Sequence, residues 1–266
     1  MKFKKIVIFS GAGISAESGI KTFRDSDGLW ENHKIEEVCD AFTWRNNYEL
    51  VHKFYDDRRE QLGTVLPNRA HELVSEWQKK YLCLNVTTNV DDMFERSGVV
   101  DTVHLHGYIP EVYCTECGMK YNLGYDRLIT DGKLNPIVNT IKSHRHDCIW
   151  HKFSNEERED SHIRKIYKPN VVFFNEAAPK YSLYYNILKQ IDHETLVIVV
   201  GASNIVVDFI RDLEYKASQL VVIDPNEKIL DNYLPIPGVI FHNTMATEGF
   251  EILNDYIKNN VKEKEY

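Results

Sequence analysis

A turn near the start of the chain has the residue types that bind phosphate. Gly11-x-Gly13-x-x-Ala16 follows a short apolar run at 5–10 and opens an expected helix. Glycines let the backbone approach a pyrophosphate closely, and the first N–H groups of a helix are free to bind it. Tight turns of this composition also occur without a ligand. We expect a dinucleotide-binding turn between a strand and a helix.

A second candidate for nucleotide binding is Asp224, which follows the apolar run 219–223 and precedes Pro225-Asn226. A carboxylate at the carboxyl end of a parallel strand can hold the diol of a ribose. It would also repel a 2′-phosphate, which favours NAD over NADP. The alternative is an aspartate that caps a turn or a helix, and on residue type alone this is the commoner case.

Two pairs of ligands have the spacing of tetrahedral zinc sites, Cys114-x-x-Cys117 and Cys148-x-x-His151. His146 or His144 could replace His151 as the fourth ligand. With four protein ligands the metal has no open position and is structural. A redox Cys-x-x-Cys is the competing interpretation, but that motif begins a helix after a strand, whereas this one lies in a polar stretch. The sequence therefore favours structural zinc.

Two histidines, His104 and His106, lie at the end of an apolar run. A histidine at the carboxyl edge of a sheet can act as a general base near neutral pH, because its ordinary pKa is about 6.5. A lone histidine is more often a structural residue, and the spacing does not choose between the two.

Tyr55 and Arg58 lie three residues apart on one face of an expected helix that also carries Tyr48, Val51 and Leu62. An arginine on such a face usually pairs with a structural carboxylate. The alternative is a fork that binds the carboxylate of a ligand, with the phenol as a second donor.

Alternating strands and helices are expected to position these side chains. Buried strands are predicted at 5–10, 81–86, 170–174, 195–200, 219–223 and 238–241. Helical patterns lie between them at 48–62, 70–80, 204–216 and 247–259, with Asn68 as the N-cap of the second. The pattern predicts an α/β fold with a parallel sheet covered on both faces, interrupted at 108–168 by a polar module that has few core residues.

Composition narrows the class of protein. The 266 residues contain 32 Lys and Arg against 40 Asp and Glu, a net charge of −8. This negative charge argues against DNA or RNA as a partner, because proteins that bind phosphate backbones need clustered Lys and Arg. The apolar runs are too short to cross a membrane, and no signal-peptide core is evident. Five cysteines, an odd number, fit a reducing compartment. We expect a soluble cytoplasmic protein with no membrane partner.

Taken together, the motifs resemble those of the sirtuin family of NAD-dependent protein deacylases. The matching stretches are 11–20 (GAGISAESGI), 22–24 (TFR), 28–30 (GLW), Pro67-Asn68 with His71, 87–91 (TTNVD), 105–107 (LHG), the Cys-x-x-Cys, 168–176 (KPNVVFFNE) and 201–203 (GAS). The resemblance implies a Rossmann-like NAD-binding large domain at 1–107 and 169–266, with an inserted zinc-binding module at 108–168. Part of the helical segment 31–66 is a candidate to belong to the same small domain as this module.

The resemblance also implies roles for single residues. It matches His106, rather than His104, to the catalytic base. The implied cofactor-binding residues are Gly11, Ala12, Gly13 and Ser15 at the pyrophosphate, Phe23, Arg24, Thr88, Asn89 and Asp91 at the nicotinamide and its ribose, and Gly201, Ala202, Ser203, Asp224, Pro225, Asn226 and Met245 at the adenosine. Asn89 and Asp91 join His106 in the catalytic set. Phe173, Phe174, Asn175 and Glu176 are implied to run beside the substrate peptide.

The implied reaction is NAD-dependent removal of an acyl group from lysine, with nicotinamide, O-acyl-ADP-ribose and free lysine as products. Zinc is implied to be structural, and the chain is expected to be a monomer or weak oligomer. Tyr55-x-x-Arg58 resembles the signature of the sirtuin branch that removes acidic acyl groups, which implies succinyl- and malonyl-lysine as substrates.

Three positions depart from the family pattern. Thr88 stands where family members usually have Gln, Asn175 where they have Gly, and His151 where they have Cys. The Thr-Thr-Asn-x-Asp variant also resembles sirtuin-like NAD hydrolases. The alternatives are therefore an NAD hydrolase, an ADP-ribosyltransferase, or an inactive module that senses NAD or ADP-ribose.

Overall fold

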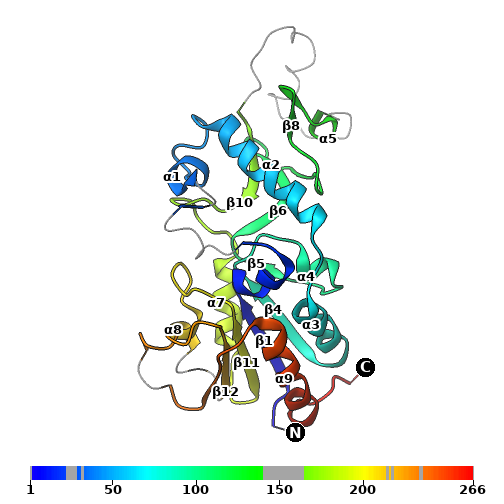
Figure 1. Cartoon of the computed structure of the whole chain (residues 1–266), viewed down its shortest axis with the longest axis vertical. Coiled ribbons are helices and arrows are strands. Elements are labelled where there is room, and N and C mark those ends of the chain that lie inside the picture. The colour runs from blue at the N-terminus through cyan, green and yellow to red at the C-terminus, as the bar shows by residue number, and fades with distance from the viewer. Residues whose placement is uncertain are drawn as a thin grey trace. The chain divides into compact units, whose positions relative to one another are not determined.

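The computed structural model describes residues 2–21, 29–30, 33–139, 165–213, 216, 219–233 and 236–265. The chain divides into two compact units (Figure 1). Unit 1 comprises Met1–Gly28, Val65–Gly107 and Ala178–Tyr266, and unit 2 comprises Leu29–Thr64 and Tyr108–Ala177. Within the described residues, no helix has the length and apolar character that crossing a bilayer requires.

Unit 1 is built on one six-stranded sheet of order β13-β12-β11-β1-β4-β5. All neighbouring strands run parallel, as the sequence predicts. The strands are β1 (Lys5–Ser10), β4 (Leu82–Thr87), β5 (Val103–His104), β11 (Thr195–Val200), β12 (Gln219–Ile223) and β13 (Val239–His242).

The register of the sheet brings the carboxyl ends of its strands to one edge. Ser10 pairs with Thr87 on one side and with Val200 on the other, and Val200 pairs with Ile223. The residues that follow β1, β4, β11 and β12 therefore emerge together. These residues include most of those that the sequence assigns to nucleotide binding.

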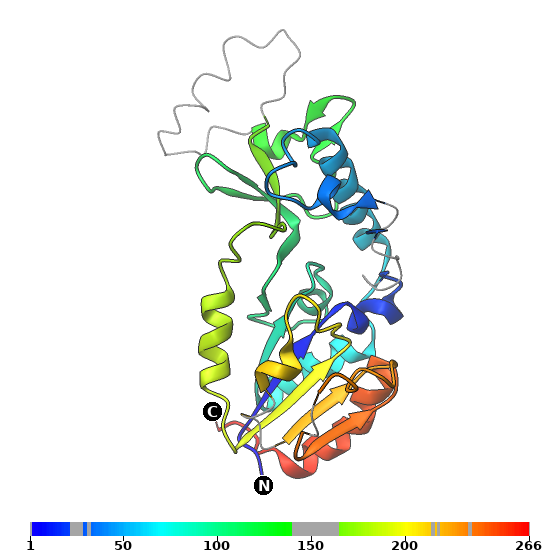
Figure 2. The same ribbon diagram turned by 90° about the vertical axis from the view of Figure 1, so that its left-hand side faces the viewer.

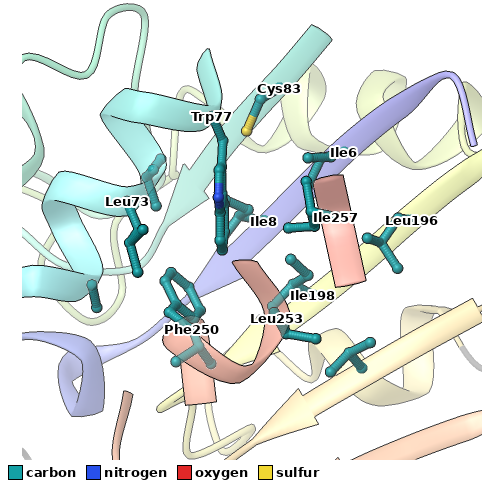
Figure 3. Packing of buried hydrophobic residues seen from close by; sticks show 14 of the residues in the cluster. Ile6, Ile8, Leu73, Trp77, Cys83, Leu196, Ile198, Phe250, Leu253 and Ile257 are labelled. Atoms are coloured by element: carbon teal, nitrogen blue, oxygen red, sulfur yellow. The ribbon is translucent and has the colours of Figure 1, made fainter. Parts of the chain in front are cut away.

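Alternate residues of the strands face opposite sides of the sheet, and each side carries a core. Ile6 and Ile8 face the side that is covered by α3 (Arg69–Lys80) and α9 (Ala246–Asn260) (Figure 3). Val7 and Phe9 face the side that is covered by α7 (Tyr181–Lys189) and α8 (Phe209–Leu213). Figure 2 shows α7 and α9 on opposite sides of the sheet. The prediction of a sheet covered on both faces is confirmed.

Two of the predicted helices differ from expectation. The turn at Gly11 leads into a 3₁₀ helix, η1 (Ala12–Ser18), instead of an α-helix, and the Gly13 N–H in its first turn bonds to the Gly201 carbonyl. In the helix predicted at 204–216, the described helical residues are Phe209–Leu213, and 214–215 lie outside the described residues. Asn204 has a φ of 56°, so it is not part of an α-helix. By contrast, Asn68 caps α3 as predicted, accepting a bond from the Ala70 N–H.

Unit 2 combines a long helix with a three-stranded sheet of order β10-β6-β7. Its elements are β2 (Leu29–Trp30), β3 (His33–Lys34), α1 (Ile35–Val38), α2 (Tyr48–Thr64), β6 (Gly107–Cys114), β7 (Lys120–Asn122), β8 (Ile129–Thr130), β9 (Lys133–Leu134), α5 (Pro136–Asn139) and β10 (Tyr167–Val171). Unit 1, for comparison, also contains the short helix α4 (Met93–Arg96). The strand expected at 170–174 begins and ends earlier, because Phe174 bonds instead to Cys39 and Ala41.

Unit 2 has an apolar cluster of its own, which the polar composition of 108–168 did not suggest. Its buried members are Val112, Cys114, Tyr121, Leu123, Leu128, Val138 and Tyr167. A fully buried ion pair between Asp56 and Arg59 lies beside this cluster, and the N–H of Leu128 donates to the same carboxylate. The bond from Leu128 to Asp56 therefore links α2 to the segment before β8.

Candidate active site

The glycine turn after β1 packs directly against the turn after β11. The Gly11 N–H donates to Val200 O (3.0 Å), and the Gly13 N–H donates to Gly201 O (2.9 Å). A Cβ atom on Gly13 would lie 2.5 Å from the Gly201 Cα, and Gly201 itself has a φ of 55°. The structure therefore gives these glycines a packing role that the sequence did not indicate, because two backbones meet here without room for side chains.

A buried hydrogen-bond network joins the glycine turn to the loop after β4. The Ser15 hydroxyl donates to Asp91 Oδ2 (3.0 Å) and accepts from Asn89 Nδ2 (3.2 Å). His71 Nε2 lies 3.4 Å from the same hydroxyl, and the ring is joined through Nδ1 to Asn68, the cap of α3. Three of the predicted site residues, Ser15, Asn89 and Asp91, are thus brought together.

Burial governs the electrostatics of this network. Burial raises the pKa of the Asp91 carboxyl, against the opposing hydrogen bonds from the Met93 N–H and the Ser15 hydroxyl. Burial also lowers the pKa of His71 to about 4, so this ring is neutral at physiological pH. The network is a fixed set of polar atoms at the edge of the sheet. Sequence reasoning placed His71 in a motif but gave it no role.

The structure separates the two histidines that the spacing left ambiguous. The two ring nitrogens of His104 face the Asn89 carbonyl (2.8 Å) and Glu95 Oε1 (3.0 Å), and the side chain is 5% exposed. This is the setting of a structural histidine that holds the Asn89 backbone. His106 Nε2 faces the Tyr181 hydroxyl (3.1 Å). Burial lowers the pKa of His106, and a hydrogen bond to the Thr88 backbone opposes this effect.

Thr88 is turned back toward β1. Its N–H and its hydroxyl both donate to Ser10 O, at 3.0 and 3.3 Å. The Thr88 side chain is therefore bonded to the end of β1.

The residues assigned to the adenosine lie after β11 and β12. Ser203 and Asn226 line a cavity of about 670 Å³. Asp224 is 2% exposed and its Oδ1 accepts the Asn226 N–H (2.9 Å), which is the turn-capping arrangement of the alternative interpretation. Ala202 is buried and Pro225 is exposed.

Met245 lies at the start of α9, on the glycine-turn side of unit 1. It is the N-cap residue of the helix and is 37% exposed. Glu17 of η1 accepts the Thr247 N–H (2.8 Å), so the first turn of α9 is bonded to the glycine-turn helix. Phe23 and Arg24, the remaining cofactor residues, lie outside the described residues.

In unit 2, Tyr55 and Arg58 lie on α2. Tyr55 is fully buried, its ring stacks on Phe173 (5.7 Å), and its hydroxyl lies beside the Cys39 thiol. Burial raises the pKa of this phenol. The Arg58 guanidinium lies over the Phe54 ring (3.1 Å). Its neighbour Arg59 forms a buried ion pair with Asp56.

The segment predicted to border a peptide is held by a buried lysine. Lys168, 2% exposed, donates to Glu176 Oε2 (2.9 Å), which also accepts the Phe173 N–H (2.8 Å). Burial lowers the pKa of Lys168, and the charge of Glu176 opposes this effect. Asn175 has a φ of 64° and donates to Asp40 Oδ2 (2.7 Å). The left-handed backbone explains why glycine or asparagine is suited to this position.

The Cys-x-x-Cys forms a tight turn at the end of β6. The Gly118 N–H donates to Cys114 O (2.8 Å), and the N–H groups of Glu116 and Cys117 donate to the Cys114 sulfur. Among the described residues, no three His, Cys, Asp or Glu side chains are gathered as a metal site. Cys148 and His151 lie outside the described residues, as do His144 and His146.

Comparisons with known proteins agree with these motifs. A model of the Sir2 family matches residues 11–208. NAD-dependent protein deacylases of Helicobacter hepaticus and Campylobacter jejuni are 34% identical over 252 residues and 41% identical over 205 residues. The matches cover 88% and 76% of this chain, and the same shares of the relatives.

Solved structures show the same fold. An ADP-ribose complex of a Sir2 homologue variant is 26% identical, with 96% of this chain and 92% of that chain covered and a TM-score of 0.73. An NAD complex of a Sir2 homologue is 27% identical, with 96% and 90% covered and a TM-score of 0.66. The family model spans the glycine turn, both histidines and the Cys-x-x-Cys turn, and on this evidence the chain belongs to the Sir2 family.

Proposed function

We propose that this chain is an NAD-dependent protein-lysine deacylase that produces nicotinamide, free lysine and O-acyl-ADP-ribose. The observation that carries the proposal is the environment of His106 in a chain of the Sir2 family. The ring lies at the carboxyl edge of the parallel sheet, is held neutral by burial, and points Nε2 at a hydroxyl. A neutral imidazole of this kind can act as a general base.

The residues of unit 1 divide the proposed work among them. NAD supplies the ribose whose bond to nicotinamide breaks and whose hydroxyls need a base. His106 accepts a proton at Nε2. Ser15, Asn89 and Asp91 form one fixed network, so the amide and carboxylate need no reordering when the nicotinamide end binds. The glycine turn and the cavity at Ser203 are assigned to the pyrophosphate and the adenosine.

The test is a panel of acetyl-, malonyl- and succinyl-lysine peptides incubated with NAD and read by mass. We expect peptide-dependent nicotinamide release, equimolar O-acyl-ADP-ribose, and the loss of both in His106→Ala. His193→Ala, at an exposed histidine of unit 1, is the control and should retain both. Nicotinamide release that does not depend on peptide would identify an NAD hydrolase instead.

We further propose that succinyl and malonyl groups are removed at least as efficiently as acetyl groups, with Tyr55 and Arg58 as the ligands of their carboxylates. Arg58 is half-buried on the same helical face as Tyr55, and the two side chains are close enough for the guanidinium charge to lower the pKa of the phenol against the larger effect of burial. A charged hydrogen bond contributes about 1.5–3 kcal/mol where water is excluded, which is about 10- to 150-fold in kcat/KM.

Arg58→Met tests the acyl preference. The ratio of succinyl to acetyl kcat/KM should fall by that factor, and Lys53→Met, an exposed cation on the same helix, should leave it unchanged. An unchanged ratio in Arg58→Met refutes the fork.

We propose structural zinc on Cys114, Cys117, Cys148 and His151. The Cys114 and Cys117 thiols are hydrogen-bonded to each other, and backbone N–H groups point at the Cys114 sulfur, which is the donor set that a thiolate pair needs. The metal would cross-link unit 2 and take no part in the reaction. Metal analysis should find one zinc per chain, lost in Cys114→Ser together with thermal stability. A protein free of zinc with unchanged melting refutes the site.

A further inference from the structure

Tyr181 contacts the proposed base from a distant part of the sequence. Its hydroxyl lies 3.1 Å from His106 Nε2, and the two rings are tilted by 36° with centroids 6.2 Å apart. Both residues belong to unit 1, His106 after β5 and Tyr181 as the first residue of α7. None of the sequence motifs includes Tyr181.

The position of Tyr181 is set by a packed helix. One turn further along α7, Tyr184 is 1% exposed, contacts the rings of Phe9 and Phe209, and donates to Asp212 Oδ2 (2.7 Å). The Tyr181 ring packs on Tyr184, with centroids 6.4 Å apart. The phenol is therefore fixed relative to β1, at the centre of the sheet.

The two hydrogen bonds of His106 determine its tautomer. A neutral imidazole has one N–H and one lone pair. We assign the ring N–H to the nitrogen that bonds to the Thr88 backbone, which leaves the lone pair on Nε2 as the acceptor for the Tyr181 hydroxyl. The titratable group that faces His106 from α7 is Tyr181, with Tyr185 behind it. The effects on the pKa of His106 are burial and the Thr88 bond, with no charged group among them in the described part of the chain.

We propose that Tyr181 is a positioning residue that keeps His106 ready as a base in the free enzyme. Its hydroxyl bonds to the Nε2 lone pair and so stabilises the neutral ring in the one tautomer that can accept a proton there. When substrate binds, its hydroxyl replaces the Tyr181 hydroxyl as the donor to the Nε2 lone pair. The substrate hydroxyl then transfers its proton to Nε2. This proposal rests on the proposed deacylase function.

Tyr181→Phe removes the hydroxyl and keeps the ring. Because the lost hydrogen bond was made to the neutral form, the pKa of His106 should rise. The acid limb of kcat/KM, which reports the free enzyme, should move to higher pH. On that limb kcat/KM should fall about 2- to 10-fold, the equivalent of one hydrogen bond, while kcat on the alkaline plateau stays within about 2-fold.

The matched control is Tyr185→Phe. Tyr185 lies on the same helix, is 51% exposed and contacts the Tyr181 ring, so its profile should match that of the wild type. An NMR titration of the His106 ring nitrogens, without NAD or peptide and assigned with His106→Gln, measures the same pKa and tautomer independently of activity. If the wild-type protein is inactive but the pKa of His106 still rises in Tyr181→Phe, the deacylase function is rejected and the role of Tyr181 stands.

Two results would overturn the proposal. In the first, the NMR titration and the pH profile of Tyr181→Phe superimpose on those of the wild type. In the second, kcat on the alkaline plateau falls more than about 10-fold, because the hydroxyl would then act in the reaction itself and not in the free enzyme.

Discussion

A buried histidine in unit 2 should make this protein unstable in acid. His52 is fully buried on α2, its Nε2 N–H donates to Tyr167 O (3.0 Å), and Nδ1 makes no hydrogen bond within the described residues. Burial lowers the pKa of His52 to about 3, and the charges of Arg59 and Lys168 act in the same direction. A second proton would place an uncompensated charge on Nδ1 in the core.

The sign and size of the effect follow from linkage. The unfolded chain binds a proton at His52 below pH 6.5, whereas the folded chain binds it only near pH 3. Protonation of His52 therefore does not lower the free energy of unfolding above pH 6.5, and it lowers this free energy progressively as the pH falls toward 3. At pH 5 the loss is about 1.5 × 1.36, or about 2 kcal/mol, a large part of a typical stability of 5–15 kcal/mol.

The assay is denaturant unfolding at pH 7.5 and pH 5.0, followed by circular dichroism. In His52→Gln, whose amide can still donate to Tyr167 O, the difference in unfolding free energy between the two pH values should shrink by about 2 kcal/mol. His193→Gln, at an exposed position, should leave the difference unchanged. If His52→Gln retains the full difference, the assignment of the acid sensitivity to this ring is refuted.

Three further substitutions test the rest of the site. Gly13→Ala places a Cβ 2.5 Å from the Gly201 backbone, so we expect about 1–3 kcal/mol of destabilisation and a raised KM for NAD, measured by melting and steady-state kinetics; unchanged melting would contradict the packing role. Ser15→Ala removes the centre of a buried network, and we expect about 1–3 kcal/mol lower stability with reduced kcat, whereas unchanged melting would show the network to be unimportant. Lys168→Met leaves the half-buried Glu176 without its cation and should cost about 1.5–3 kcal/mol in chemical unfolding, with partial recovery on adding Glu176→Gln; no recovery would refute the pairing.

The asparagine at 175 shows how a departure from a family pattern can be compensated. Its φ of 64° favours glycine, yet the side chain donates to Asp40 and so gains a bond that glycine cannot make. Asparagine also tolerates a positive φ better than most residues do. The partner Asp40 lies 135 residues away, and no local pattern indicates it.

Much of the fold was accessible from local patterns. The parallel sheet, its two cores, the cap at Asn68 and the glycine turn depend on residue types within a few positions of one another, and periodicity and turn chemistry record these directly. The end of β10 was not accessible, because Phe174 bonds to Cys39 and Ala41, which are distant in the sequence.

The sequence by itself determined the family, the α/β class and the candidate side chains, because each is encoded in short ordered motifs. Only the tertiary structure decided what each side chain contacts. In the folded chain, His104 is bonded to the Glu95 carboxylate and the Asn89 carbonyl, and His106 contacts the Tyr181 hydroxyl. The Asp224 carboxylate accepts the N–H of Asn226 in its own turn. The physical reason is that burial and hydrogen-bond partners set the chemistry of a titratable group, and these come from segments that meet only when the sheet forms.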